Sequence, residues 1–169
     1  MIQRPQSFLE NALGHQNRSV TTEVLGHGPT LPSADVCRVP NVSEHTAGFE
    51  LVRRRLLEGT PALYSVNYSP PALVPVVATA NAVLNGSGSL TEVLAAAGYV
   101  FGGAHRAIRA AIPTPEIAAA LEVSESTPVL HIRSTSWTAG GERYDTYDTF
   151  MRSDVVPLEI NVNVGGTGR

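Results

Sequence analysis

Two stretches of the sequence have the pattern of a β-hairpin, and this repeated pattern constrains the fold more than any other feature. In the first, residues 49–57 alternate with a period of two, Glu58-Gly59-Thr60-Pro61 supplies a tight turn, and residues 62–68 form the returning strand. The second has the same organisation over residues 128–151, with its turn at Thr138-Ala139-Gly140-Gly141. Because a hairpin pairs its strands antiparallel, we predict that both hairpins lie in one mainly antiparallel sheet.

Short helices are expected between these strands. Ser89-Leu90-Thr91-Glu92 is a capping box, and Thr114-Pro115-Glu116 combines an N-cap with a proline at the first helical position. The remaining patterns predict helical turns at 7–13, 33–39 and 72–80, a loop at 26–32, and strands at 20–25, 99–111 (with a bulge at Gly102-Gly103) and 158–164. Since no βαβ rhythm is present, we predict an α+β domain, mainly an antiparallel sheet with short helices packed on it.

Composition limits the classes of function. A chain of 169 residues is expected to form one soluble domain, 1–169, with residues 1–6 and 165–169 frayed. A net charge of −3 argues against a nucleic-acid-binding face, and neither a membrane-spanning run nor a signal peptide is found, so we expect a cytoplasmic protein. Cys37 is the single cysteine and the histidines lack metal-ligand spacing, so we expect no disulfide, no metal and no cofactor.

Arginines on the first predicted hairpin are the leading candidates for ligand binding. Arg53 and Arg55 fall on the same side of their strand, and two adjacent guanidinium groups suit a carboxylate or a phosphate. The alternative is an exposed strand whose arginines pair with acidic side chains. Arg54 is expected on the opposite, surface side. Ser89 is a second candidate, because a helix start after a glycine-rich loop can hold an anion, although capping alone also explains it.

Acid–base candidates lie on the second hairpin and before it. Asp145 and Tyr147 share one face of the last strand, where a carboxylate and a phenol could orient or protonate a substrate. The alternative is that Asp145 pairs with Arg143 or Arg133 across the hairpin. His105 follows the predicted bulge and is a further acid–base candidate, with a solvated histidine as the alternative.

Motifs spread over most of the chain resemble one known family. Val52-Arg53-Arg54-Arg55-Leu56-Leu57-Glu58-Gly59-Thr60-Pro61, Ser89-Leu90, the run from Pro115 to Leu130, and Phe150-Met151-Arg152-Ser153-Asp154 occur in its order and spacing, after an opening Ser7-Phe8. The sequence resembles the UTRA ligand-binding domain of GntR/HutC transcription regulators, which shares its fold with chorismate lyase. The resemblance implies that fold, a small-molecule ligand and a homodimer.

The resemblance also implies site residues. It places ligand at Arg53 and Arg55 and near Asp145, and it puts Ser65 where many regulators have a glutamate, which argues against a sugar-phosphate-like ligand. With these we group the remaining candidates for substrate binding, which are Tyr64, Arg133 and Trp137. Met1 lies only a few residues before Ser7-Phe8, so the winged helix-turn-helix of the regulators is expected to be missing.

Three functions are compatible with these patterns. Without a DNA reader, the chain is expected to be a stand-alone, cofactor-free lyase or cyclase that closes a ring or eliminates a group from a largely apolar intermediate, such as a polyketide or polyene. The alternative is the effector-sensing domain of a GntR/HutC regulator, lacking or separated from its DNA-binding domain. A third is a module that only sequesters ligand or forms dimers, because one scaffold can host unrelated functions.

Overall fold

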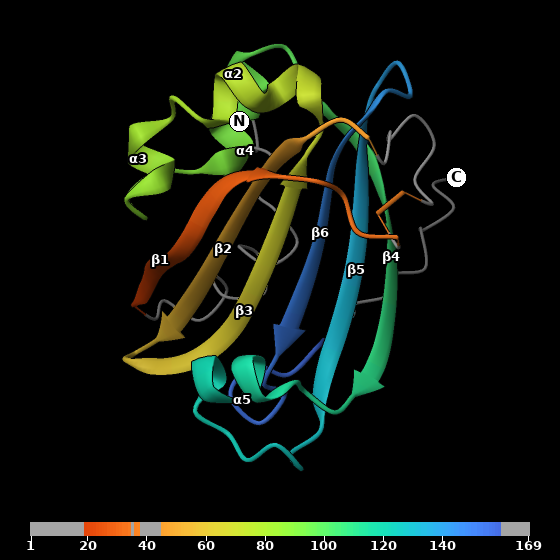
Figure 1. The fold of residues 1–169 in the computed structure, drawn as a ribbon. Helices are drawn as coiled ribbons and strands as arrows, with labels where there is room; N and C mark the ends of the chain where they lie inside the picture. The colour runs from red at the N-terminus through yellow and green to blue at the C-terminus, as the bar shows by residue number, and fades with distance from the viewer. Residues whose placement is uncertain (1–18, 35, 38–44, 160–169) are drawn as a thin grey trace, which may run out of the picture.

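The computed structural model describes residues 19–34, 36–37 and 45–159. Its centre is a six-stranded sheet in the order β1-β2-β3-β6-β5-β4, in which every neighbouring pair of strands is antiparallel (Figure 1). The strands are β1 (Val20–Thr30), β2 (Gly48–Leu57), β3 (Thr60–Ser69), β4 (Phe101–Ala111), β5 (Val129–Thr138) and β6 (Arg143–Met151). The predicted α+β class and both predicted hairpins are confirmed.

Short helices connect the strands. A single 3-10 turn η1 (Pro71–Leu73) leads into α2 (Val74–Val77), α3 (Asn81–Leu84) and α4 (Leu90–Ala96), and α5 (Pro115–Leu121) joins β4 to β5. The two predicted caps form, because Ser89 Oγ accepts a hydrogen bond from the Glu92 amide and Thr114 Oγ1 accepts one from the Ile117 amide. In Figure 1, α2, α3 and α4 lie at one end of the sheet and α5 lies at the other.

The two faces of the sheet carry different layers. On the face that we call the helix face, Phe49 and Leu51 pack with Leu73, Val77, Val83, Leu90 and Leu94 of the short helices. The same face ends in a second apolar cluster that includes Leu57, Leu63, Ile132 and Met151. The opposite face, which we call the α5 face, packs Tyr64 and Val129 against Ile117 and Leu121 of α5. Each face therefore buries its own set of alternating side chains.

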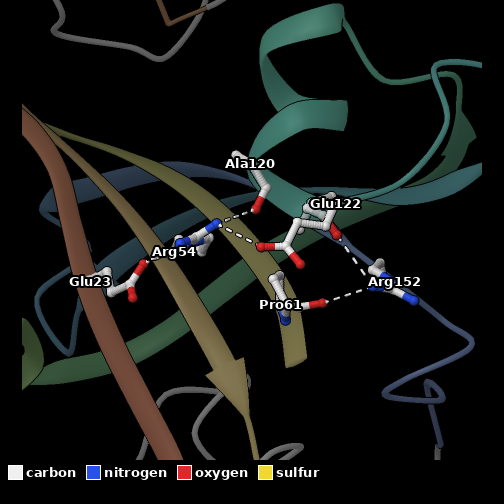
Figure 2. A network of polar contacts seen from close by, with 7 residues as sticks. Glu23, Arg54, Pro61, Ala120, Glu122 and Arg152 are labelled. Carbon is white, nitrogen blue, oxygen red and sulfur yellow. Dashed lines mark hydrogen bonds and ion pairs between the residues drawn. The ribbon is translucent and has the colours of Figure 1, made fainter. Parts of the chain in front are cut away.

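An ion-pair network fastens α5 to the sheet (Figure 2). Arg54, on β2, donates to Glu23 Oε2 of β1 over 2.6 and 2.8 Å and to the Ala120 carbonyl over 3.1 Å, and it lies 3.6 Å from Glu122 Oε1. Arg152 donates to the Pro61 and Leu121 carbonyls. Arg54 lies on the opposite side from Arg53 as expected, but it is not a simple surface residue, because its side chain is 21% exposed and connects two strands to the end of α5.

Two predicted elements differ from the structure, and one helix was not predicted. The predicted loop at 26–32 is largely strand, because β1 continues to Thr30 through a register shift at Val24/Gly26. β1 is an edge strand, where glycine and proline are tolerated, so Gly26, Gly28 and Pro29 do not end it. Leu158 and Glu159, the described part of the predicted last strand, are not in a strand, and helix α3 was not predicted. The predictions for 1–6, 7–13, 35, 38–39 and 160–169 fall outside the described residues.

Candidate functional site

Polar side chains lie between the two apolar clusters of the helix face. Strand register places Arg53 opposite Ser65, and Asn67 opposite Tyr147, so that these side chains share this face across β2, β3 and β6. Arg53 is 6% exposed and Asn67 is 5% exposed. Burial of a guanidinium and an amide costs free energy unless both are hydrogen-bonded, which makes their partners informative.

A chain of hydrogen bonds crosses three strands at this point. Arg53 Nη2 donates to Asn67 Oδ1 over 2.8 Å, and Asn67 Nδ2 donates to Asp145 Oδ1 over 3.3 Å. The amide therefore holds a cation on one side and a carboxyl group on the other. The two groups are fixed on the rigid sheet rather than on loops, which favours a preorganised binding site.

Asp145 has a strongly shifted pKa. Burial raises its pKa to about 6, although the Asn67 hydrogen bond and the positive charge of Arg53 oppose the shift. The neighbouring Tyr144 is affected in turn, because burial, followed by the charges of Asp145 and Tyr147, raises its pKa to about 12. Asp145 thus changes protonation close to neutral pH, where a carboxyl group can serve as hydrogen-bond donor or acceptor to a ligand.

Buried hydroxyl groups complete the polar cluster. Ser65 Oγ lies 3.2 Å from Thr149 Oγ1, and both residues are at least 96% buried. Ser134, opposite Tyr147 in the register, is fully buried, and its hydroxyl has no hydrogen-bond partner among the described residues. A buried polar group without a partner is uncommon in native proteins and is expected where a ligand or water binds.

Two predicted ligand-binding residues lie beside this cluster. Arg55 is opposite Leu63 in the register, which places it on the helix face, two residues from Arg53 as predicted. Ser89 caps α4, whose Leu90 and Leu94 pack with Leu51 at the adjoining end of the same face. The cap hydrogen bond accounts for the Ser89 hydroxyl oxygen as acceptor and leaves its proton available.

Four other predicted site residues lie on the α5 face. Tyr64 is opposite Phe150, and His105 is opposite Thr135, which is itself opposite Thr146. These pairings place His105 across the sheet from Asp145 and Tyr147, so the three predicted catalytic residues do not form one site. The physical reason is the register of β4: after a shift inside the strand at Phe101/Gly103, where a bulge was predicted, His105 pairs with Thr135.

Arg133 and Trp137 also differ from their predicted roles. Arg133 forms a two-pronged ion pair with Asp148, over 2.8 and 2.9 Å, on the α5 face. It therefore does not pair with Asp145, as one alternative had it, and it does not join Arg53. Trp137 lies opposite Gly103 in the register, and a Cβ on that glycine would meet the indole ring at 2.8 Å. The close contact with β4 indicates a packing role for Trp137.

Asn67, Ser134 and Thr149 were missed by the sequence analysis. One signal was available for Asn67, since it lies two residues after Ser65 and two before Ser69, so that the three polar side chains share one face of the strand. The described residues contain no group of three or more histidine, cysteine, aspartate or glutamate side chains that could hold a metal ion. Within the same residues, no helix has the length and apolar character needed to cross a membrane.

Comparisons with known proteins agree on one family. The UTRA domain family model matches residues 15–156. The effector domain of PhnF from Mycobacterium smegmatis superposes with a TM-score of 0.83 at 16% identity, covering 96% of this chain and all 100% of that one. The C-terminal domain of the histidine utilization repressor from Pseudomonas syringae gives a TM-score of 0.74 at 12% identity, covering 86% of this chain and 100% of its own.

One of the similar solved structures belongs to a chain that is longer than the matched region. The possible transcriptional regulator YydK from Bacillus subtilis gives a TM-score of 0.77 at 16% identity, and the match covers 96% of this chain but 68% of that one. None of the curated proteins matches the chain in sequence. The family match spans most of the chain, the fold agrees with these structures, and the chain therefore belongs to the UTRA domain family of ligand-binding domains.

Proposed function

We propose that this chain is an effector-binding domain that holds a small anionic molecule on the helix face, at Arg53, Arg55 and Asp145. The observation that carries the proposal is the hydrogen-bonded chain from Arg53 through Asn67 to Asp145. Ligand binding alone explains this hydrogen-bonded chain, since a sensor needs only to bind its ligand specifically and reversibly. The match to the UTRA domain family over residues 15–156 supports this role over that of a stand-alone enzyme.

The polar cluster favours a ligand with two kinds of group. Arg53 and Arg55 suit a carboxylate or a phosphate, because a guanidinium forms paired, charge-assisted hydrogen bonds with either. Asp145 and the Ser134 hydroxyl suit a hydroxyl or an amine on the same molecule. The apolar residues at both ends of the cluster, such as Leu51 and Met151, suit a hydrocarbon body between them.

An enzyme remains the second candidate, and one observation favours it. Asp145 has a pKa of about 6, and a general acid or base works best with a pKa near the working pH. Tyr147 lies two residues after Asp145 on the same face of β6. It is 8% exposed, and its side chain supplies a phenol group. A lyase or cyclase would use Asp145 to move a proton while Arg53 holds an anionic group. His105 has no part in this version because it lies on the other face.

Metabolite capture separates the two candidates. The purified chain is incubated with a small-molecule extract, free compounds are removed, and retained compounds are released by denaturation and identified by mass spectrometry. An effector domain retains an anionic compound that is recovered unchanged, and its yield falls with Arg53→Ala. An enzyme depletes a compound from the extract while a product accumulates, more slowly with Asp145→Asn. Arg109→Ala is the matched control, since Arg109 is an exposed arginine on the edge strand β4.

A further inference from the structure

A pocket of about 400 Å³ opens on the α5 face, on the side of the sheet away from the Arg53 cluster. Its floor comes from β2, β3 and β6 and one wall comes from the start of α5, where Thr114, Glu116 and Ile117 line it. Pockets that hold small molecules are typically about 300 to 1,000 Å³ in volume, so this pocket suits a compact ligand.

Among the described residues, three carboxyl groups line the pocket, and ion pairs neutralise one of them, Asp148. Asp148 is paired with Arg133 over 2.8 and 2.9 Å, and His131 Nε2 lies 2.6 Å from its Oδ1. Glu50 has no hydrogen bond or ion pair within the described part of the chain, and Glu116 accepts only the Tyr64 hydroxyl, over 3.3 Å. No arginine or histidine is among the described residues that line the pocket. Among the described lining residues, the negative charges of Glu50 and Glu116 therefore have no positive side chain beside them.

Aromatic rings line the pocket beside the carboxyl groups, and they too can bind a cation. Tyr64, Tyr68 and Phe150 all line the pocket, and Phe150 is held in place by stacking on His131 with ring centroids 4.6 Å apart. The faces of such rings attract ammonium groups, most strongly where water is excluded. The pKa of Tyr64 is raised to about 12, first by burial and then by the charge of Glu116, the hydrogen bond to Glu116 and the charge of Glu50.

Tyr68, one of the residues that line the pocket, has a buried hydroxyl group without a hydrogen-bond partner in the described part of the chain. Tyr68 is 5% exposed, and its hydroxyl oxygen forms no hydrogen bond with any described residue. The ring is packed against the backbone of Gly48, where an added Cβ would lie 2.6 Å from the ring carbon that bears the hydroxyl. A phenol oxygen that is fixed, buried and unsatisfied is a ready acceptor for an N–H donor.

We propose that the α5-face pocket is a second ligand site and that it binds a small organic cation, a primary amine with an apolar or aromatic body. The ammonium group lies between Glu50 and Glu116 and donates to the Tyr68 oxygen, and the body of the ligand packs on Tyr64 and Phe150. This site is separate from the Arg53 cluster and selects the opposite charge, so it stands or falls independently of the proposed effector site.

Benzylamine and benzyl alcohol test the charge selectivity, because they have nearly the same shape and differ in charge at neutral pH. Binding is followed by amide chemical shifts in NMR titrations of the whole chain. We expect benzylamine to shift signals of Val66, Thr146 and Phe150 and to bind at least about tenfold more tightly than benzyl alcohol. Its affinity falls as salt is added, because part of the attraction is between partly exposed charges.

Two isosteric variants test the residues. Glu50→Gln and Glu116→Gln remove one charge each with little change of shape, and each lowers the affinity for benzylamine about fivefold to tenfold. Glu142→Gln, at the exposed turn between β5 and β6, leaves it unchanged. The proposal is overturned if the two probes bind equally, if neither shifts the pocket signals at about 10 mM, or if both glutamine variants bind benzylamine as the wild type does.

Discussion

The Arg53 guanidinium donates a hydrogen bond of 2.8 Å from Nη2 to Oδ1 of Asn67, the residue two positions beyond its own register partner Ser65. Both residues are at least 94% buried. The bond places a cation on the helix face of the sheet and turns the other end of the amide toward Asp145. The proposed effector site depends on this arrangement.

Asn67→Ala is expected to remove the hydrogen-bonded link between Arg53 and Asp145. Arg53 and Asp145 each lose a buried partner, so the free energy of unfolding falls by about 2 kcal/mol. The pKa of Asp145 rises further, because the hydrogen bond from Asn67 is one of the interactions that lower it. Carbon-13 NMR of the Asp145 carboxyl group during a pH titration measures this shift. An unchanged titration of Asp145 in Asn67→Ala would contradict the geometry described here.

Asp145→Asn is expected to stabilise the chain at neutral pH. The pKa of Asp145 is about 6 in the folded protein against 3.8 for an ordinary aspartate, so the folded state binds more protons between these values. The free energy of unfolding therefore falls as the pH rises through this window. The variant removes this loss and gains about 1 to 2 kcal/mol at pH 7, less than the full shift because Asp145 is partly exposed.

Urea unfolding at pH 4 and pH 7 measures this effect. Wild type and Asp145→Asn should differ at the higher pH and converge at the lower one, where the aspartate is protonated in the folded state. A variant that is less stable than wild type at pH 7 would mean that the Asp145 charge is stabilised by its neighbours more than it is penalised by burial.

Arg54→Ala is expected to loosen α5. The variant loses the bonds to Glu23 and to the Ala120 carbonyl, which connect β1 and β2 to the end of the helix (Figure 2). Because the pair is partly exposed, the loss of stability is about 1 kcal/mol. Hydrogen exchange should accelerate in α5 ahead of the sheet, and Arg109→Ala should change neither quantity. If the α5 amides exchanged at the same rate in the variant and in the wild type, Arg54 would not anchor α5 to the sheet.

Gly48→Ala is expected to be far more harmful than Gly26→Ala. A Cβ at Gly48 would lie 2.3 Å from the Ser69 carbonyl oxygen and 2.6 Å from the Tyr68 ring, whereas a Cβ at Gly26 meets nothing within 4 Å. Overpacking of this kind costs about 1 to 3 kcal/mol, and the backbone contact leaves little room to relax. Thermal unfolding of the two variants compares them directly. If Gly48→Ala unfolded at the wild-type temperature, strand β2 would have to lie farther from β3.

The local parts of this architecture follow from sequence patterns. Period-two alternation places Arg53 and Arg55 on one face, and the same alternation links Asp145 to Tyr147, as the register confirms. Both helix caps were predicted because a side-chain oxygen must satisfy the first free amides of a helix, whatever surrounds it. These predictions need only information from a few neighbouring residues.

Non-local pairing determines the rest. Asn67 and Asp145 are 78 residues apart and meet only because β3 pairs with β6 in one register. A shift of one residue would have turned Asp145 to the α5 face. Alternation within β4 shows which of its residues share a face, but not which face of the sheet that is. His105 was therefore grouped with Asp145, although it lies on the opposite face. The α5-face pocket is a product of the same pairings.

Titration calorimetry with the anion recovered by metabolite capture tests the central claim most directly. The account predicts that Arg53→Ala lowers its affinity by at least about tenfold, since a buried, charge-assisted hydrogen bond to the ligand is lost. Arg109→Ala should bind it as the wild type does. Equal affinity in Arg53→Ala and wild type, with the variant folded by its amide NMR spectrum, would contradict an anion site at Arg53.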